Sequence, residues 1–77
     1  MKIATWNVNG IRARKAQVLD FLAAEAPDVL CLQETKASPE QVPEPLCSVA
    51  GYHCHWHGHK GYSGVALLLR TAKYGEE

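Results

Sequence analysis

Two short apolar segments, each ending in polar side chains and separated by one helix-length stretch, constrain this fold more than any other feature. Lys2–Trp6 carries apolar bulk on both faces and ends at Asn7, whereas Val29–Leu32 is continuously apolar and leads to Glu34. Arg14–Ala26 between them has an apolar helical face and is followed by a proline. This β-α-β pattern predicts two parallel strands joined by a right-handed crossover.

The two strand ends predict a ligand-binding rim. Parallel neighbours bring their C-terminal ends side by side, and ligands of open α/β sheets bind in the crevice at those ends. Asn7 and Glu34, which are far apart in the sequence, are therefore expected to meet at one edge. An amide oxygen and a carboxylate suit a hard cation such as Mg2+. The residues alone predict half of such a site.

The middle of the chain predicts short helical turns. Residues 38–41 have the pattern of a capped helix start, with Ser38 as the N-cap. Pro43 and Pro45 are expected to interrupt this helix, and a further turn is predicted at Leu46–Ala50.

Tyr52–His57 and Gly64–Arg70 are predicted to form two strands joined by a short loop. Val65–Leu69 is apolar on both faces, so it should need covering layers above and below and strand neighbours on each side. Lys2–Trp6 is expected to be an interior strand for the same reason. A chain of 77 residues offers too little material for this cover, so we expect the sequence to stop within a larger domain.

Charge and cysteine content narrow the class of protein. Lys+Arg and Asp+Glu are both 8, so no overall basic excess marks a nucleic-acid-binding protein. Arg12, Arg14 and Lys15 could nevertheless guide a polyanion to the rim.

The 3 cysteines show no C-x-x-C spacing and no secretory signal precedes them, so we expect reduced thiols and a cytoplasmic protein. The longest apolar run, Val65–Leu69, is far too short to span a membrane.

Three segments are similar to a known family. Trp6–Arg12 reads W-N-V-N-G-I-R, Pro27–Lys36 reads P-D-V-L-C-L-Q-E-T-K, and Lys60–Leu67 reads K-G-Y-S-G-V-A-L. In this order and at these spacings they resemble the N-terminal portion of the exonuclease III family, the abasic-site endonuclease branch of the endonuclease/exonuclease/phosphatase superfamily. The W-N and Q-E pairs fit the whole superfamily, whereas N-G-I-R, Q-E-T-K and G-Y-S-G narrow the resemblance to this branch.

This resemblance implies an α/β fold: a partial four-layer α/β sandwich of mixed β-sheets with outer helices, truncated after the early strands. It also implies Mg2+-dependent hydrolysis of DNA phosphodiesters 5′ to abasic sites and from 3′ ends, with Mn2+ as an alternative cofactor. The implied partner is duplex DNA with abasic sites or 3′ ends, bound by a monomer in base excision repair without membrane association.

Carried over by position, the resemblance also assigns roles to single residues. Glu34 would be a direct metal ligand, and Asn7 would be a metal ligand or a hydrogen-bond donor at the scissile phosphate. Asn9 would support the metal ligands from the second shell of contacts. The residues implied to contact DNA are Gly10, Arg12, Lys36 and Tyr62.

The family's general base, its tyrosine and its C-terminal histidine would all fall beyond Glu77. The resemblance therefore implies that residues 1–77 are the N-terminal part of one catalytic domain and are inactive by themselves. The alternative is a superfamily member without catalysis that serves as a nucleic-acid-binding or regulatory protein.

Simpler structural roles for the same residues stay open. Glu34 could be a solvated charge at a strand end, and Asn7 and Asn9 could be ordinary turn residues. Arg12 and Lys36 could be surface charges that contact nothing.

Three histidines, His53, His55 and His57, alternate along a predicted strand and therefore share one face. Such an array could bind Zn2+. The alternative is a polar, half-exposed strand face with Cys54 and Trp56 pointing inward.

Overall fold

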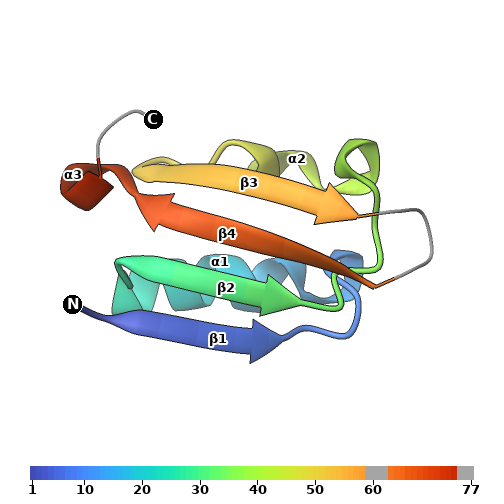
Figure 1. Ribbon diagram of the computed structural model, residues 1–77, viewed down its shortest axis with the longest axis horizontal. Helices are drawn as coiled ribbons and strands as arrows, with labels where there is room; N and C mark the ends of the chain where they lie inside the picture. Colours follow the sequence, from blue (N-terminus) through green and yellow to red (C-terminus); the bar gives the residue numbers. More distant parts are fainter. Residues whose placement is uncertain (59–62, 75–77) are drawn as a thin grey trace.

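The computed structural model describes residues 1–58 and 63–74, with side chains given as far as residue 72 (Figure 1). Strands and one longer helix make up most of it, with short helical turns between them. In chain order the elements are β1 (Ile3–Asn7), η1 (Arg12–Arg14), α1 (Lys15–Glu25), β2 (Val29–Gln33), η2 (Pro39–Gln41), α2 (Glu44–Cys47), β3 (Tyr52–Gly58), β4 (Gly64–Arg70) and α3 (Thr71–Tyr74).

The strands form one mixed four-stranded sheet in the order β1-β2-β4-β3. β1 and β2 are parallel, with Ile3 opposite Val29 and Asn7 opposite Gln33. The β2–β4 and β4–β3 pairs are antiparallel. The parallel pairing predicted from the β-α-β pattern is therefore confirmed, and so is the α/β class. β4 also has the expected strand neighbour on each side.

One expectation about the sheet is not met by the described residues. Within them β1 is hydrogen-bonded to a strand on one side only, so the interior position predicted for it is not seen there. Apolar bulk on both faces of a strand predicts what lies above and below the sheet, and it carries no information about lateral neighbours. Ile3 is in fact 59% exposed, which shows that even the cover is incomplete.

Helix α1 has clear local causes for both its position and its end. Val18 and Leu22 are buried on its inner side. At the C-terminus Ala26 takes a left-handed conformation (φ 41°) and donates its backbone N–H to the carbonyl of Leu22 at 3.0 Å. Pro27 follows and prevents continuation. The observed helix with its preceding η1 turn matches the predicted segment to within one or two residues.

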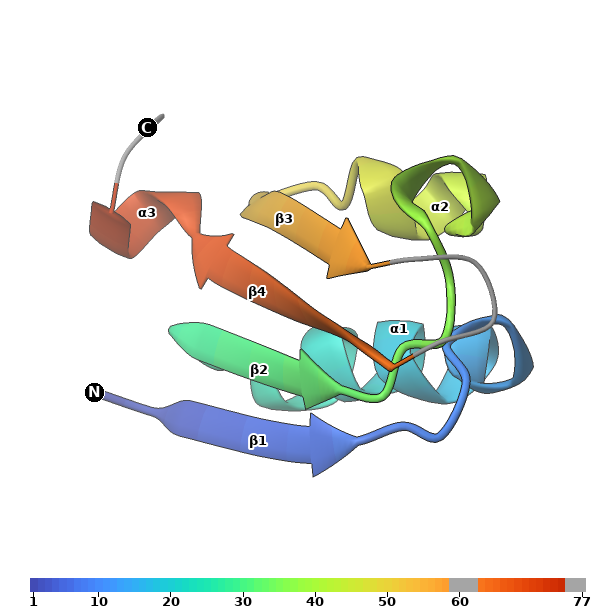
Figure 2. The same ribbon diagram turned by 45° about the vertical axis from the view of Figure 1, so that its right-hand side comes forward.

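Helix α1 and the short helix α2 cover the same side of the sheet. Figures 1 and 2 together show α1 and α2 behind the strands. Their buried side chains share one core with inward-facing strand residues. The fully buried members include Val18 of α1, Leu46 of α2, Leu30 and Leu32 of β2 and Leu68 of β4.

The opposite face of the sheet is open. Val65 is 51% exposed and Leu67 is 42% exposed, although both belong to the most apolar strand. Of the covering layers that β4 was expected to need, the described residues supply one. The structure thus shows two layers, a sheet and the helices on one of its faces.

The middle segment is short and helical, as expected. The predicted cap is present, because the backbone N–H of Ser38 donates to the Gln41 side-chain oxygen at 3.0 Å, and the helix that begins there ends at Gln41, before Pro43. The further turn, α2, begins two residues earlier than the predicted Leu46 and includes Pro45. Pro45 occupies the first turn, where a helix residue has no intrahelical partner for its N–H, so the missing donor does no harm.

A network of hydrogen bonds closes the end of the sheet where β1 and β2 begin. The buried Asp28 carboxylate accepts from the Lys2 backbone N–H at 2.7 Å and from Arg70 Nε at 3.0 Å, and it also forms an ion pair with Arg70 Nη2. This hydrogen bonding raises the pKa of the Arg70 guanidinium. The Tyr52 hydroxyl donates to the carbonyl of Pro27 at 2.6 Å, and burial raises the pKa of that hydroxyl. All four strands are tied together here. We call this set, Lys2, Asp28, Tyr52 and Arg70, the closed end.

Candidate active site

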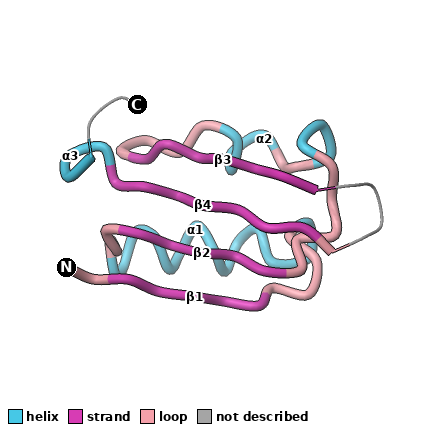
Figure 3. The backbone as a smooth tube through the Cα atoms, viewed as in Figure 1, coloured by secondary structure: helices cyan, strands magenta, loops and turns pink. Residues whose placement is uncertain are grey.

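At the other end of the sheet, β1 and β2 terminate side by side. Asn7 pairs with Gln33, so Glu34 is the first residue beyond the paired segment. The loops that leave both strands gather at this end together with the start of β4 (Figure 3). The topology therefore brings Asn7 and Glu34 to one edge, as the sequence predicted. We call this edge, residues 7–12 and 33–37, the rim.

Backbone hydrogen bonds hold the two halves of the rim together beyond the strands. They continue the parallel ladder into the turn that carries the asparagines. The donors and acceptors are Val8 N–H to Gln33 O (3.0 Å), Gly10 N–H to Glu34 O (2.8 Å) and Ile11 N–H to Thr35 O (2.9 Å).

The rim concentrates unusual backbone conformations. Asn9, Glu34 and Lys36 have positive φ values of 48°, 54° and 54°. A left-handed conformation at a non-glycine residue costs about 1–2 kcal/mol. Such residues persist only where the surroundings impose them, and they gather at functional sites. Between them Thr35 is buried, with 1% exposure, so Glu34 and Lys36 are presented at the surface on either side of a fixed anchor.

The polar side chains of the rim are partly engaged with one another. Asn7 Oδ1 accepts the backbone N–H of Asn9 at 3.1 Å, and Lys36 Nζ donates to Asn9 Oδ1 at 2.6 Å. Within residues 1–58 and 63–72, the half-buried Glu34 carboxylate has no hydrogen bond or ion pair. This carboxylate is therefore available to a ligand from outside.

The donor set fits a hard divalent cation in part. The Glu34 carboxylate and the Asn7 amide oxygen are both oxygen donors of the kind that Mg2+ prefers, and Mg2+ commonly keeps several waters beside one or two protein ligands. In the part of the chain that the structure describes, no group of three or more His, Cys, Asp or Glu side chains could hold a metal ion. The rim therefore offers two oxygen donors, and the predicted role of this pair as half of a metal site stays a prediction.

The other predicted site residues divide into two groups. Gly10 (φ 104°) lies in the turn beside Glu34, and the exposed Arg12 begins η1 directly after it. Lys36 is tied to the rim through Asn9. Tyr62, the remaining predicted DNA contact, lies outside the described residues.

Sequence reasoning missed the residues that press against the rim from β3 and β4. The backbone N–H of Thr35 donates to the carbonyl of Gly64 at 3.2 Å. A Cβ atom on Gly64 would collide with the Thr35 hydroxyl, and one on Gly58 would lie 2.8 Å from the Ala37 carbonyl oxygen. These glycines let the β3–β4 hairpin approach the loop that carries Glu34. The G-Y-S-G motif was the only sequence signal for this contact.

The histidine strand has the inward-facing side that one of its two interpretations predicted. Cys54 and Trp56 pack against the core, and burial raises the pKa of the Cys54 thiol. His55 and His57 are exposed on the other face. A three-histidine metal site is not formed by the described residues.

The α/β fold, with polar residues at the ends of two parallel strands, agrees with the result of the family comparison. A model of the endonuclease/exonuclease/phosphatase family matches residues 4–76. The chain belongs to this family. Within the family its relatives carry the names of the exonuclease III branch, as the sequence motifs predicted.

Two curated relatives and two solved structures illustrate the similarity. The chain is 46% identical over 76 residues to the DNA repair nuclease APEX1 of Danio rerio, covering 92% of this chain and 24% of that protein. It is 43% identical over 70 residues to exodeoxyribonuclease III of Haemophilus influenzae, covering 91% and 26%.

Among solved structures, a 3′ phosphatase, NExo from Neisseria bound to a product DNA hairpin, superposes with a TM-score of 0.82 at 46% identity, covering 91% of this chain and 27% of that chain. An AP endonuclease from Archaeoglobus fulgidus superposes with a TM-score of 0.82 at 45% identity, covering 90% and 27%. The chain thus spans about a quarter of the length of these four relatives.

Proposed function

We propose that this chain supplies the Asn7–Glu34 side of the catalytic centre of a divalent-metal-dependent DNA nuclease. The proposed reaction is hydrolysis of phosphodiesters 5′ to abasic sites and at 3′ ends of duplex DNA. The observation that carries the proposal is the Glu34 carboxylate, held at a left-handed backbone position beside the end of β1 and without a partner in the described residues. The names of the relatives, which include DNA repair nuclease and AP endonuclease, support the substrate class.

The proposed metal is Mg2+, with Mn2+ as an alternative, held by the Glu34 carboxylate and the Asn7 amide oxygen. When bound, such a cation polarises a phosphoryl oxygen and stabilises charge on the leaving oxygen. The role of Asn9 is to fix the Asn7 side chain, because its backbone N–H donates to Asn7 Oδ1.

Cationic and backbone groups beside Glu34 suit the phosphates of the DNA strand. Arg12 is exposed at the start of η1, and Lys36 Nζ stays at the rim through its hydrogen bond to Asn9. Charge-assisted contacts of this kind position a phosphate without reading base sequence. We propose the same role for Gly10, whose glycine backbone permits a close approach, and for Tyr62.

The 77-residue chain is proposed to be inactive by itself, because the family resemblance implies a general base outside these residues. General acid–base catalysis by one group accelerates a reaction about 10²–10⁴-fold.

The natural gene product containing this chain is proposed to act as a cytoplasmic monomer. No described helix is long and apolar enough to cross a membrane.

The test is nicking of a duplex that carries one abasic analogue by the natural gene product. Glu34→Gln should lower the rate by more than about 100-fold, because loss of a metal ligand is at least as severe as loss of a supporting residue. EDTA should abolish nicking, and added Mg2+ should restore it. The matched control is Glu25→Gln, since Glu25 pairs with Lys2 at 3.1 Å on the exposed far side.

Nicking that survives both EDTA and Glu34→Gln would refute the metal role of the rim. Duplex binding without any nicking by the unsubstituted gene product would instead favour the catalytically silent, nucleic-acid-binding alternative. Equal losses in Glu34→Gln and Glu25→Gln would show that the substitutions act through general destabilisation.

A further inference from the structure

A second group of potential ligands lies on the open face of the sheet, away from the rim. His53 and His55 occupy alternate positions of β3, so their side chains project from the same face. The sheet register places His53 in line with Leu69 of β4 and His55 in line with Leu67. Both histidines therefore stand at the edge of an apolar surface.

The two imidazole rings lie close enough to converge on a shared ligand. Their centroids are 6.4 Å apart and their planes are inclined by 34°. Metal–imidazole nitrogen bonds of about 2.0–2.1 Å place two ring centres about 4.5–5 Å apart when the ligands meet at octahedral or tetrahedral angles. The observed spacing is larger than this, so rotation of the side chains has to bring the rings together when an ion binds.

One ring nitrogen at this place lacks a partner. His53 Nε2 is buried, and no hydrogen bond to it is found among the described residues. Leaving a buried polar atom unpaired costs about 1–3 kcal/mol. A metal ion bound to this nitrogen would therefore recover the free energy of folding that the unpaired atom costs.

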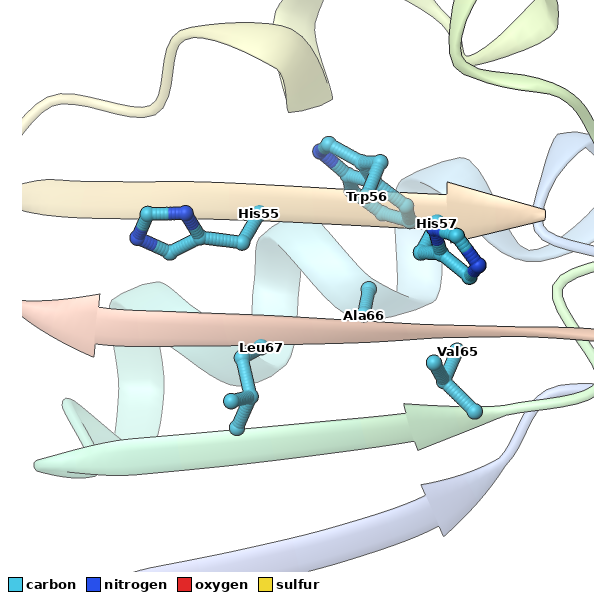
Figure 4. A pocket seen from close by; sticks show the side chains of 6 residues that line it. All are labelled: His55, Trp56, His57, Val65, Ala66 and Leu67. Atoms are coloured by element: carbon cyan, nitrogen blue, oxygen red, sulfur yellow. The ribbon is translucent and has the colours of Figure 1, made fainter.

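His57 completes the alternating array but lies apart from the other two rings. Figure 4 shows the His55 ring turned along β3 toward the start of the strand, where His53 lies. The His57 ring extends in the other direction, and the sheet register places His57 opposite Val65. A hollow of about 180 Å³ is lined by residues that include His55 and His57. The pair to consider is therefore His53 with His55.

We infer that His53 and His55 form a two-histidine site for a borderline transition-metal ion such as Ni2+ or Zn2+. Imidazole pairs select such ions over Mg2+, which prefers oxygen ligands, so this site and the rim would not compete for the same metal. Two protein ligands leave the remaining coordination positions to water. The inference is independent of the proposed nuclease function, because it uses no residue of the rim.

The experiment titrates Ni2+ into the 77-residue chain by calorimetry, with a parallel series of 1H–15N spectra, because Ni2+ broadens nearby amide signals. His53→Asn and His55→Asn should each weaken binding at least tenfold. Signals of β3 and of the adjoining part of β4 should broaden first. The control His57→Asn carries the same substitution on the same strand face and should change affinity less than twofold.

Two further controls test whether other side chains of this chain bind the Ni2+. Cys31→Ser removes the thiol that lies in register with Leu67 on the same face, and Glu34→Gln removes the rim carboxylate. Both variants should bind Ni2+ as the unsubstituted chain does. Ni2+ should also raise the urea midpoint of the unsubstituted chain but not that of His55→Asn, because a ligand that binds only the folded state stabilises it.

Unchanged affinity in His55→Asn would overturn the inference, as would a loss confined to His57→Asn or Cys31→Ser. Equally tight Ni2+ binding in denaturing urea would also overturn it, since the folded strand would then not be needed to position the histidines. Tenfold losses in both His53→Asn and His55→Asn, together with the midpoint shift, would establish the site.

Discussion

The two ends of the sheet hold their charged groups in opposite ways. At the closed end the Asp28 carboxylate is buried and accepts hydrogen bonds from Lys2 and Arg70. At the rim the Glu34 carboxylate has no such partner in the described part of the chain, and its position is fixed by its own backbone. The hydrogen-bonded carboxylate joins the strands, whereas the carboxylate without a partner is the one for which we propose a metal ligand. The difference between the two ends is thus whether protein groups satisfy the carboxylate.

The sharpest way to separate the two ends is to remove each carboxylate in turn. Asp28→Ala should destabilise the fold by about 2–4 kcal/mol, because it removes the buried acceptor of the hydrogen bonds from the Lys2 backbone N–H and the Arg70 guanidinium. Glu34→Ala should change the free energy of unfolding by less than about 0.5 kcal/mol. Urea unfolding followed by circular dichroism measures both, and a larger loss from Glu34→Ala would reverse the comparison.

A smaller effect tests what holds the rim in place. Gly64→Ala forces a methyl group against the Thr35 hydroxyl and should cost about 1–3 kcal/mol. The amide signals of Glu34 and Gly10 should shift with it, since Gly10 donates to the Glu34 carbonyl.

The matched control for this contact is a double-mutant cycle with Thr35→Ala, which removes the colliding hydroxyl. Gly64→Ala should cost clearly less in that background, because the two side chains no longer meet. Additive costs would mean that Gly64 acts through its own backbone and does not clamp the rim.

The smallest expected effect concerns the pH dependence of the closed end. Burial raises the pKa of Tyr52, so the folded state keeps the phenol proton more tightly than the unfolded chain does. The resulting stability is present below the ordinary pKa of about 10 and is lost as the pH rises through the raised value. Tyr52→Phe should therefore flatten the fall in stability above pH 10.

At neutral pH the same substitution should cost about 1 kcal/mol through the lost hydrogen bond to Pro27. Thermal unfolding at pH 7 and at pH 10.5 measures both parts. An alkaline transition that is identical in Tyr52→Phe would assign it to other groups.

Local signals and simple topology account for the features that the sequence predicted. Helix α1 follows from its apolar spacing and the proline after it, and the parallel pairing follows from one helix between two apolar segments. Given that pairing, Asn7 and Glu34 had to reach the same edge. None of these steps needs knowledge of a distant contact.

Features that depend on packing between distant segments could not be predicted. The edge position of β1 depends on which strands exist elsewhere, and the contact between Gly64 and Thr35 depends on the angle at which a hairpin approaches a loop. The positive φ of Glu34 is imposed by the ladder that ties the rim together, since the amino-acid type itself disfavours it.

The parallel pairing of β1 with β2 also has a consequence for folding kinetics. Neighbouring parallel strands cannot meet until the intervening helix has crossed over, so their contacts carry a large loop-closure entropy and form slowly. Asn7 and Glu34 come together only in that step. A nascent chain therefore cannot offer Asn7 and Glu34 together to the proposed divalent ion until β1 and β2 have paired.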